Sequence, residues 1–345
     1  MLMMSNDLGV DLGTCNVLIY VDGKGVVVKE PSVVAMDKND GKILQVGAAA
    51  RNMMGRTPGN VVAVKPLTGG IISDHEMTVR MLSSMFKSAA KSGLLTPKPR
   101  VVISVPSGIT EVEERNVINA AIEAGARRVF LIEEPLASAL GAGMDLKDAK
   151  GHMVVDIGGG VTNVAVLSMN GVVLSSSVRI AGDYFDEVIA RYIRRKYNLV
   201  IGQVTAEAVK INLGQVYPGG EELQMDVKGR DAKTGSPRSI PVSSLEIYEI
   251  LHRHAAAIAD EVTDVLSRTS PELVGDIAET GITLTGGCAQ ISGMKELIME
   301  KTHIPCVVAD DPASCAAYGC GKSLAWINHM QEGPINIARK RLMRT

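Results

Sequence analysis

The chain has 345 residues, of which 46% are hydrophobic and 21% are charged. These proportions exclude wholesale disorder, and the length suggests two domains or one large lobed domain. The formal net charge of −2 and the 3% content of aromatic residues leave neither a global basic field nor a set of base-stacking platforms. Nucleic acid is therefore not an expected partner.

Five cysteines are scattered along the sequence without a CxxC pair. This pattern argues against a disulfide framework or a zinc site and fits a reducing compartment. Residues 1–7 lack the basic region and apolar core of a signal peptide. No apolar run approaches the ~18 residues of a membrane span. We therefore expect a cytoplasmic protein, which can still touch a membrane surface.

Hydrophobic patterning predicts strands and hairpins that alternate with helices, which is typical of α/β proteins. The expected strands are residues 8–12, 17–21, 26–28, 32–36, 42–46, 101–105, 129–132, 153–157, 164–167, 172–178 and 282–285. The expected helices include residues 82–89, 110–125, 184–197 and 247–266 and a short one that opens at Pro135. Thr110 and Glu113 have the spacing of a capping box. Asp22-Gly23 and Asn170-Gly171 are expected hairpin turns.

One pattern occurs twice, 145 positions apart. Residues 10–17 read VDLGTCNV, and residues 155–164 read VDIGGGVTNV. Each copy is a strand, an aspartate, a glycine turn, a hydroxyl residue, an asparagine and a second strand. This repeat predicts two similar lobes, each of which contributes one Asp-Gly turn to a shared cleft.

A glycine-rich turn exposes consecutive backbone N–H groups, and the hydroxyls of Thr14 and Thr162 add donors, so two such turns could clamp a polyphosphate. Carboxylates beside phosphates repel them, and a bridging Mg²⁺ at Asp11 and Asp156 would remove that conflict. The alternative for each turn taken alone is an ordinary strand end.

Three further candidate site segments each have an alternative interpretation in which they play only a structural role. The Glu133-Glu134 pair at the end of a strand could orient or deprotonate a water, or could simply favour the N-terminus of a helix. Glu207 and Lys210 could contact a ribose, or could form an exposed ion pair on one helix face. Residues 286–289 (GGCA) could let an adenine lie on the backbone, or could be a plain connection.

Residues 316–323 (AAYGCGKS) nearly match a phosphate-binding P-loop. Ala316 replaces the first glycine, no strand is expected before it, and residues 310–312 (DDP) indicate a helix start. A P-loop requires a strand, a loop and a helix in that order, so we interpret this segment as a structural helix.

At these residues the chain resembles the actin/Hsp70/sugar-kinase ATPase superfamily and, within it, the bacterial actins of the MreB family. The resemblance covers about residues 7–330. The matching stretches are residues 9–14 (GVDLGT), 30–34 (EPSVV), 55–59 (GRTPG), 130–135 (FLIEEP), 154–160 (VVDIGGG), 179–183 (RIAGD) and 284–287 (LTGG).

The resemblance implies an α/β, two-domain actin-like fold, which is a duplicated ribonuclease H-like ATPase fold with four subdomains around a central nucleotide cleft. Domain I would comprise residues 1–147 and 314–345, with a small subdomain inserted at about 35–76. Domain II would comprise residues 148–313, with a small subdomain inserted at about 184–246.

The resemblance also implies that ATP or ADP binds with Mg²⁺. The nucleotide contacts would come from Asp11, Gly13, Thr14, Cys15, Asn16, Gly158, Gly159, Gly160, Glu207, Lys210, Gly286, Gly287, Cys288 and Ala289. Asp11 and Asp156 would hold Mg²⁺ through water. Glu134 would orient the attacking water, and Asp156 and Thr162 would complete the catalytic set.

Members of this family polymerise into filaments beneath the inner membrane and guide cell-wall synthesis in non-spherical bacteria. The implied partners are therefore further copies of the chain, the inner-membrane surface, and morphogenesis and cell-wall synthesis proteins. The implied location is the cytoplasmic face of that membrane, and any ATPase activity would be weak and coupled to polymerisation.

The sequence departs from the family pattern at three places. Residues 161–163 (VTN) stand where Thr-Thr and an acid are usual, which puts the hydrolysis rate in doubt, because Asn163 cannot act as a base. Cys288 replaces the third glycine of the adenine turn. Residues 65–70 (KPLTGG) lack the charged pair expected after Pro-Leu.

Leu94 and Leu95 are adjacent in an expected loop, and four cations surround them in the sequence: Lys87, Lys91, Lys98 and Arg100. An apolar tip ringed by cations fits insertion among anionic lipid headgroups, whereas the alternative is that both leucines pack on their own domain. The apolar start at residues 1–4 and the basic tail at 339–344 could add membrane contacts.

A small-molecule kinase of the sugar-kinase type on the same fold is the alternative function, although we find no sugar-pocket signature. A chaperone ATPase is less favoured, because the chain stops at Thr345 without a substrate-binding region.

Overall fold

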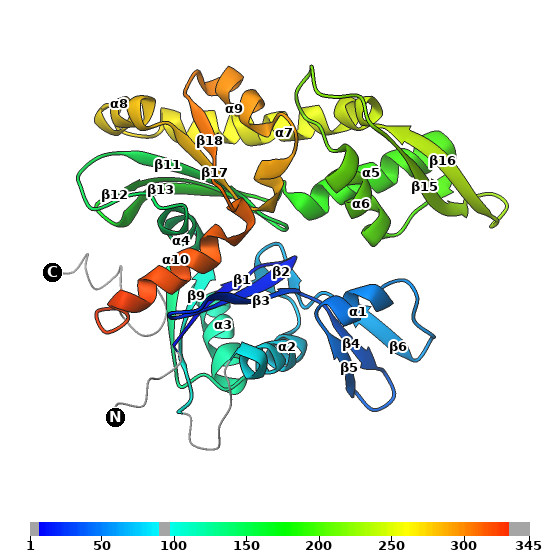
Figure 1. Ribbon diagram of the computed structural model, residues 1–345, viewed down its shortest axis with the longest axis horizontal. Coiled ribbons are helices and arrows are strands. Elements are labelled where there is room, and N and C mark those ends of the chain that lie inside the picture. The colour runs from blue at the N-terminus through cyan, green and yellow to red at the C-terminus, as the bar shows by residue number, and fades with distance from the viewer. Residues whose placement is uncertain (1–6, 90–96, 331–345) are drawn as a thin grey trace. The chain divides into compact units, whose positions relative to one another are not determined.

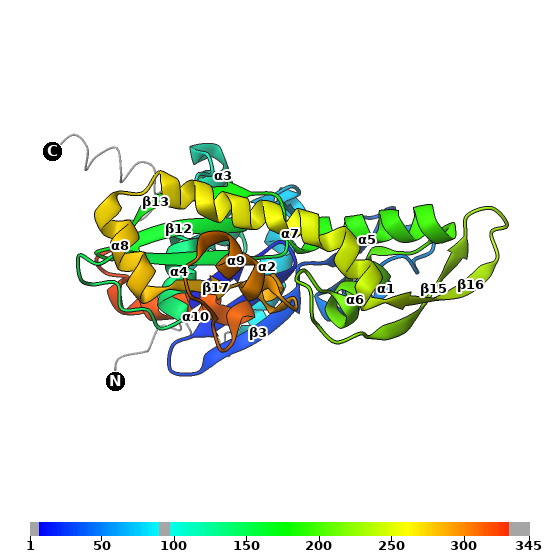
Figure 2. The same cartoon turned by 90° about the horizontal axis from the view of Figure 1, so that it is seen from above.

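The computed structural model describes residues 7–89 and 97–330, and the chain divides into two compact units. Unit 1 comprises Met1–Leu146 together with Ala313–Thr345, and unit 2 comprises Lys147–Pro312. Each unit contains one five-stranded sheet and one smaller three-stranded sheet (Figures 1 and 2).

The large sheet of unit 1 has the strand order β10-β9-β1-β2-β3. Its strands are β1 (Leu8–Leu12), β2 (Asn16–Val21), β3 (Gly25–Pro31), β9 (Arg100–Val105) and β10 (Arg128–Glu133). β1 pairs antiparallel with β2 and parallel with β9. β1 and β9 are apolar along nearly their whole length, because a central parallel strand is buried on both faces.

Helices cover both faces of this sheet. These are α2 (His75–Ala89), α3 (Glu111–Glu123), α4 (Glu134–Gly141) and α10 (Cys315–Ser323). α2 and α3 share one core with the sheet, and the predicted capping box at Thr110 and Glu113 begins α3. α4 and α10 pack against each other so closely that a Cβ on Gly319 would lie 1.7 Å from the Ala137 carbonyl oxygen.

The segment that resembles a P-loop lies inside α10. A short 3-10 helix (Pro312–Ser314) precedes it in place of a strand. Its glycines therefore serve helix packing, and the rejection of a phosphate-binding loop is confirmed.

The small sheet of unit 1 has the order β5-β4-β6, and one short helix contacts all three of its strands. The elements are β4 (Val34–Asp37), β5 (Ile43–Val46), α1 (Ala48–Met53) and β6 (Val61–Val64), followed by the two-residue strands β7 (Leu67–Thr68) and β8 (Ile71–Ile72). Figure 1 shows this sheet beside the large one.

The large sheet of unit 2 repeats the architecture of unit 1. Its order is β13-β12-β11-β17-β18, formed by β11 (His152–Ile157), β12 (Thr162–Ser168), β13 (Gly171–Val178), β17 (Ile282–Thr285) and β18 (Cys306–Val308). β11 pairs antiparallel with β12 and parallel with β17, as β1 does with β2 and β9. The two sheets thus have the same order and directions, as expected of a duplicated fold.

Six helical elements and a second three-stranded sheet complete unit 2. The helices are α5 (Gly182–Tyr197), α6 (Gln203–Leu213), α7 (Ser244–Ser267), α8 (Pro271–Thr280), the 3-10 helix η1 (Gly287–Gln290) and α9 (Met294–Thr302). The sheet has the order β14-β15-β16, formed by β14 (Leu199–Val200), β15 (Gln224–Asp231) and β16 (Pro237–Ser243). Figure 2 shows α7 running from this small sheet to the large one, and it contacts β16, β12 and β13.

Candidate functional site

The first Asp-Gly turn joins β1 to β2 in unit 1. Ser104 Oγ on β9 donates to Asp11 Oδ1 at 3.2 Å, which orients the carboxylate at the end of β1. A Cβ on Gly13 would lie 2.7 Å from the Asn16 carbonyl oxygen, so only glycine fits this tight turn.

Two hydrogen bonds from neighbouring segments hold the rest of this turn. Ser32 Oγ donates to the Gly13 carbonyl oxygen at 2.6 Å, and the buried hydroxyl of Thr14 accepts from the Gly70 amide at 2.8 Å. The accepted bond does not use the Thr14 hydroxyl proton. The divergent segment around Gly70 therefore supports the turn through its backbone. The other two predicted turn residues, Cys15 and Asn16, are half-buried and exposed, respectively.

The second Asp-Gly turn joins β11 to β12 in unit 2 and has the same construction. Asp156 is 4% exposed, and Thr285 Oγ1 on β17 donates to its Oδ2 at 2.8 Å. The Gly158 amide donates to the Val161 carbonyl oxygen at 3.0 Å and closes the turn. Gly158, Gly159 and Gly160 are all half-buried.

Strand register explains why the two aspartates have matching partners. Asp11 lies opposite Ser104 in the parallel pair β1–β9, and Asp156 lies opposite Thr285 in the parallel pair β11–β17. Each unit therefore places a hydroxyl beside its aspartate at the C-terminal end of a central strand. The sequence analysis did not identify Ser104 and Thr285. The signal that could have found them is a hydroxyl residue at or near the C-terminal end of an apolar strand.

Thr162 and Asn163 are less available than the sequence suggested. Both are fully buried. The Thr162 hydroxyl donates to the Ile180 carbonyl oxygen at 2.6 Å, and Asn163 Oδ1 accepts from Ser177 Oγ at 2.6 Å. The proton of the Thr162 hydroxyl is thus committed inside the fold, and donation to a phosphate requires that bond to break.

Gly182, the first residue of α5, is a meeting point of the predicted site residues of unit 2. Its amide donates to the Gly158 carbonyl oxygen at 3.1 Å. A Cβ here would lie 3.0 Å from Cys288 Sγ, 3.1 Å from Lys210 Nζ and 3.4 Å from Gly159 Cα. Three segments far apart in sequence, namely the second turn, α6 and the adenine turn, are therefore brought together.

The alternative interpretation of Lys210, an exposed ion pair with Glu207, is wrong because Lys210 is buried. Its Nζ lies 2.8 Å from Asp186 Oδ1 and donates to the Gly182 carbonyl oxygen at 2.9 Å. The contact with Asp186 is an ion pair without good hydrogen-bond alignment, because Oδ1 has no hydrogen-bond partner in the described residues. Burial raises the pKa of Asp186 to about 6, although Lys210 opposes the rise. Glu207 is half-buried.

The predicted adenine turn, residues 286–289, follows β17. Gly286 has φ 82° and is buried, Gly287 is exposed, and Cys288 and Ala289 are buried in η1. Burial raises the pKa of the Cys288 thiol to about 11, so the thiol stays protonated at neutral pH.

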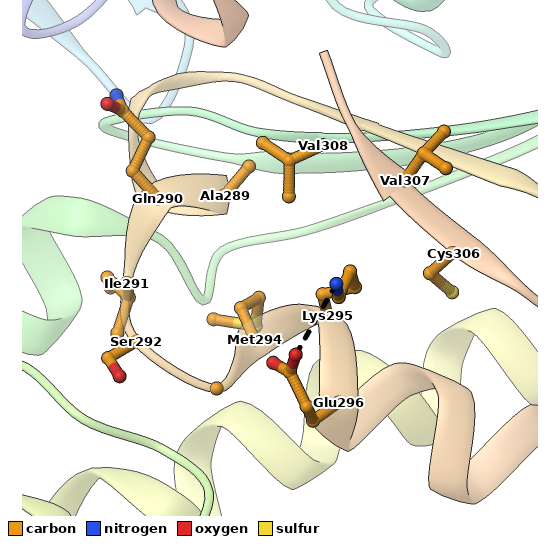
Figure 3. A pocket seen from close by; sticks show the side chains of 11 residues that line it. Ala289, Gln290, Ile291, Ser292, Met294, Lys295, Glu296, Cys306, Val307 and Val308 are labelled. Atoms are coloured by element: carbon orange, nitrogen blue, oxygen red, sulfur yellow. Dashed lines mark ion pairs between the residues drawn. The ribbon is translucent and has the colours of Figure 1, made fainter. Parts of the chain in front are cut away.

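A groove of about 490 Å³ borders the adenine turn. Figure 3 shows Ala289 and Gln290 on one side of it and Val307 on β18 on the other. Lys295 and Glu296, which form a 3.5 Å ion pair, contribute the charged part of the lining. The turn therefore has a mixed apolar and charged surface beside it.

The two adjacent glutamates of unit 1 have different environments. Glu133 ends β10, is buried and accepts from Ser107 Oγ at 2.8 Å. Glu134 begins α4 and is half-buried, so it is the more accessible of the two. Burial raises the pKa of the Cys320 thiol on α10, and the negative charges of Asp11 and Glu134 raise it further, so both carboxylates lie near this side chain.

Each unit has one aspartate whose donor chemistry suits magnesium. Asp11 and Asp156 each offer hard carboxylate oxygens beside the turn of their own unit, and Mg²⁺ usually keeps several waters when it binds with a nucleotide. Among residues 7–89 and 97–330, no group of three or more His, Cys, Asp or Glu side chains forms a metal cage.

Two predictions fall outside the described residues. The membrane-contact candidates Leu94 and Leu95 lie there, and so do residues 1–4 and the basic tail. Within the described part of the chain, no helix combines the length and the apolar character needed to cross a membrane.

Comparison with known proteins places this arrangement in a family. The family described as MreB/Mbl protein matches residues 5–332. The cell shape-determining protein MreB of Escherichia coli (strain K12) is 48% identical over 330 residues, which cover 94% of this chain and 95% of the relative. The cell shape-determining protein Mbl of Bacillus subtilis (strain 168) is 47% identical over 322 residues, which cover 93% and 96%.

Solved structures show the same fold. The crystal structure of MreB5 of Spiroplasma citri bound to AMPPNP has a TM-score of 0.88 and 37% identity, and the match covers 93% of this chain and 96% of that one. The same protein bound to ADP has a TM-score of 0.89 and 37% identity, with coverage of 94% and 98%. This likeness confirms the predicted fold class.

Proposed function

Because the chain belongs to the MreB/Mbl family of bacterial actin homologues, we propose that it is an ATP-binding cytoskeletal subunit. It polymerises into filaments at the inner face of the cell membrane and sets cell shape by organising cell-wall synthesis. Slow ATP hydrolysis sets the lifetime of the filament.

The pair of matched Asp-Gly turns carries the nucleotide-binding part of this proposal. Each turn ends a central strand, and each aspartate accepts a hydrogen bond from a hydroxyl on the neighbouring parallel strand. The Spiroplasma citri relative binds AMPPNP and ADP on the same fold. We therefore assign the two turns to the phosphates of one ATP, with the base beside residues 286–289 and the ribose beside Glu207.

Magnesium and water complete the proposed chemistry. Asp11 and Asp156 would hold Mg²⁺ through water, and the ion would supply neutralisation of the charge on the phosphates. Glu134, the accessible glutamate at the start of α4, accepts a hydrogen bond from the attacking water and orients it. Asn163 is neutral and bonded to Ser177, so it supplies no second base. Hydrolysis is slow for that reason.

The filament and membrane parts of the proposal follow from family membership. A head-to-tail contact that does not close into a ring makes an open filament. Each subunit needs only a weak membrane contact, because many along one filament add up. We assign that contact to Leu94 and Leu95. Liposome co-pelleting tests this step: a Leu94→Ser/Leu95→Ser variant that binds as well as the unaltered protein would refute it.

Sedimentation with and without Mg-ATP, followed by electron microscopy of the pellet, tests the central claim. The unaltered protein should form filaments with Mg-ATP, and Asp156→Asn should abolish them. Asp22→Asn, the same change in an exposed hairpin turn, is the matched control and should polymerise normally. A monodisperse protein that consumes ATP only when a sugar is added would instead identify a small-molecule kinase.

A further inference from the structure

The contact between α5 and α7 contains a histidine whose two ring nitrogens both have partners. His254 on α7 is half-buried, and its Nδ1 lies 3.1 Å from the hydroxyl oxygen of Tyr184 on α5. The two rings meet edge to face, with centroids 5.1 Å apart. Arg253 Nε donates to His254 Nε2 at 3.2 Å. One imidazole therefore ties α5 to α7, the long helix seen in Figure 2.

These contacts fit the neutral form of the ring. A guanidinium N–H can donate to Nε2 only while that nitrogen carries no proton, so the single proton of the imidazole is on Nδ1 and points to the Tyr184 oxygen. Burial lowers the pKa of His254 below its ordinary value of 6.5, and the positive charges of Arg253 and Arg191 lower it further. The ring is therefore uncharged at neutral pH.

A proton on His254 would be poorly accommodated. The charged groups that act on the ring, Arg253 from α7 and Arg191 from α5, are both positive. The strands β12 and β13, which also contact α7, carry no charged side chain. Charged side chains on the other neighbours of α7 pair elsewhere: Lys210 of α6 with Asp186, Arg238 of β16 with Asp231, and Lys295 of α9 with Glu296. A protonated ring loses the bond from Arg253 and is driven out toward water.

Tyr184 connects this histidine to the second Asp-Gly turn, because it is the third residue of α5. The two residues before it hold the turn through their backbone. The Gly182 amide donates to the Gly158 carbonyl oxygen at 3.1 Å, and the Asp183 amide donates to the Gly159 carbonyl oxygen at 2.8 Å. The first amides of a helix have no partner inside it, so their order depends on outside contacts of this kind. Movement of Tyr184 therefore loosens the turn.

We propose that His254 is a pH-sensitive switch of the second Asp-Gly turn. Its neutral ring holds Tyr184 and the start of α5 against α7, and its protonation releases them and weakens phosphate binding at the turn. The inference goes beyond the proposed function and rests on it, since that function assigns the turn to phosphates. The signal that this switch reads is a fall in pH.

Hydrogen exchange of the nucleotide-free full chain at about pH 7.5 and about pH 5.5 tests the switch without any need for ATP. Protection factors are compared, which removes the intrinsic pH dependence of exchange. In the unaltered protein, peptides that cover residues 158–163 and 180–186 should lose about fivefold in protection at the lower pH, the worth of one hydrogen bond. His254→Asn keeps a donor near the Nδ1 position and does not titrate, so it should not show this loss. Equal losses in the two proteins overturn the inference, and Asp186 does not confuse the comparison, because it titrates in both.

Two neighbours of His254 supply a control and a second test. His252 Nδ1 lies 2.8 Å from the Val216 carbonyl oxygen and can donate to it in either charge state, so His252→Asn should keep the loss of protection. Arg253→Gln removes one of the two positive charges that act on His254 and should move the midpoint of the loss to higher pH. This variant also serves if His254→Asn does not fold. A midpoint that does not move overturns the inference.

Nucleotide affinity connects the switch to the site. Because phosphates titrate in the same range, the comparison is between proteins at each pH. Between the higher and the lower pH, the unaltered protein should lose about fivefold more affinity for Mg-ATP than His254→Asn does, whereas adenosine should bind the two proteins alike. Equal losses of Mg-ATP affinity overturn the inference. An unaltered protein that binds no ATP at either pH overturns the proposed function, while the exchange experiment still reports whether His254 controls the turn.

Discussion

The backbone at Gly286 leaves no room for a side chain, which makes this glycine a sharp test of the site's construction. Its φ of 82° and ψ of 157° are accessible almost only to glycine. A Cβ would lie 2.4 Å from the carbonyl oxygen of Ile157 and 2.7 Å from its amide nitrogen. Both contacts are to backbone, so no side-chain rotation can relieve them.

The cost of Gly286→Ala has two parts. The strained backbone costs about 1–3 kcal/mol, and the forced shift of β11 costs about 1–3 kcal/mol by analogy with overpacked cores. We expect a total near 4 kcal/mol in the free energy of unfolding. For a unit of this size, that corresponds to a fall of about 10 °C in the Tm of unit 2. Because Ile157 precedes Gly158, nucleotide affinity should fall as well.

Differential scanning calorimetry of the nucleotide-free protein measures the effect. Gly287→Ala is the matched control, because Gly287 is exposed and a Cβ there would meet nothing within 4 Å. Its cost should stay below about 1 kcal/mol, the range of ordinary surface changes. Equal Tm shifts for the two variants would refute the argument that β11 and the adenine turn are in backbone contact.

Three other predictions follow from single contacts. Gly319→Ala should destabilise unit 1 by more than about 3 kcal/mol in urea denaturation, because its Cβ would lie 1.7 Å from the Ala137 carbonyl oxygen. Thr285→Val should cost about 1–3 kcal/mol in the same assay and weaken Mg-ATP binding, since it removes the donor to buried Asp156. Burial raises the folded-state pKa of Asp186 from 3.8 to about 6, so its contribution to stability should fall by about 3 kcal/mol as pH rises from about 4 to about 6. Denaturation across that range should lose this slope in Asp186→Asn, and a retained slope would assign it to another group.

Local sequence signals predicted nine of the ten strands of the two large sheets, the hairpins between them and both glycine turns, whereas β6, β14 and β18 were not predicted. The reason is that alternation, Asp-Gly and Asn-Gly turns and capping residues act over a few positions and are not changed by distant packing. The segment 316–323 illustrates this: the sequence before it has no strand pattern, so the P-loop interpretation could be rejected from the sequence alone. The repeat of the Asp-Gly pattern also predicted two similar lobes, and the large sheets of the two units have the same strand order.

The partners of the site residues could not be predicted, because they come from long-range register. Ser104 meets Asp11 across 93 positions and Thr285 meets Asp156 across 129, and both meetings depend on which strand lies beside which. A single hydroxyl at a strand end does not reveal its neighbour.

Lys210 shows that the partner of a charged residue is equally hard to predict from local sequence. Along α6 its nearest acid is Glu207, three residues away, and that spacing suggested an exposed pair. The buried partner is Asp186 on another helix, and the packing of α5 against α6 decides between the two carboxylates. A lysine on an otherwise apolar helix face is therefore better interpreted by asking which carboxylate the tertiary fold can bring to it.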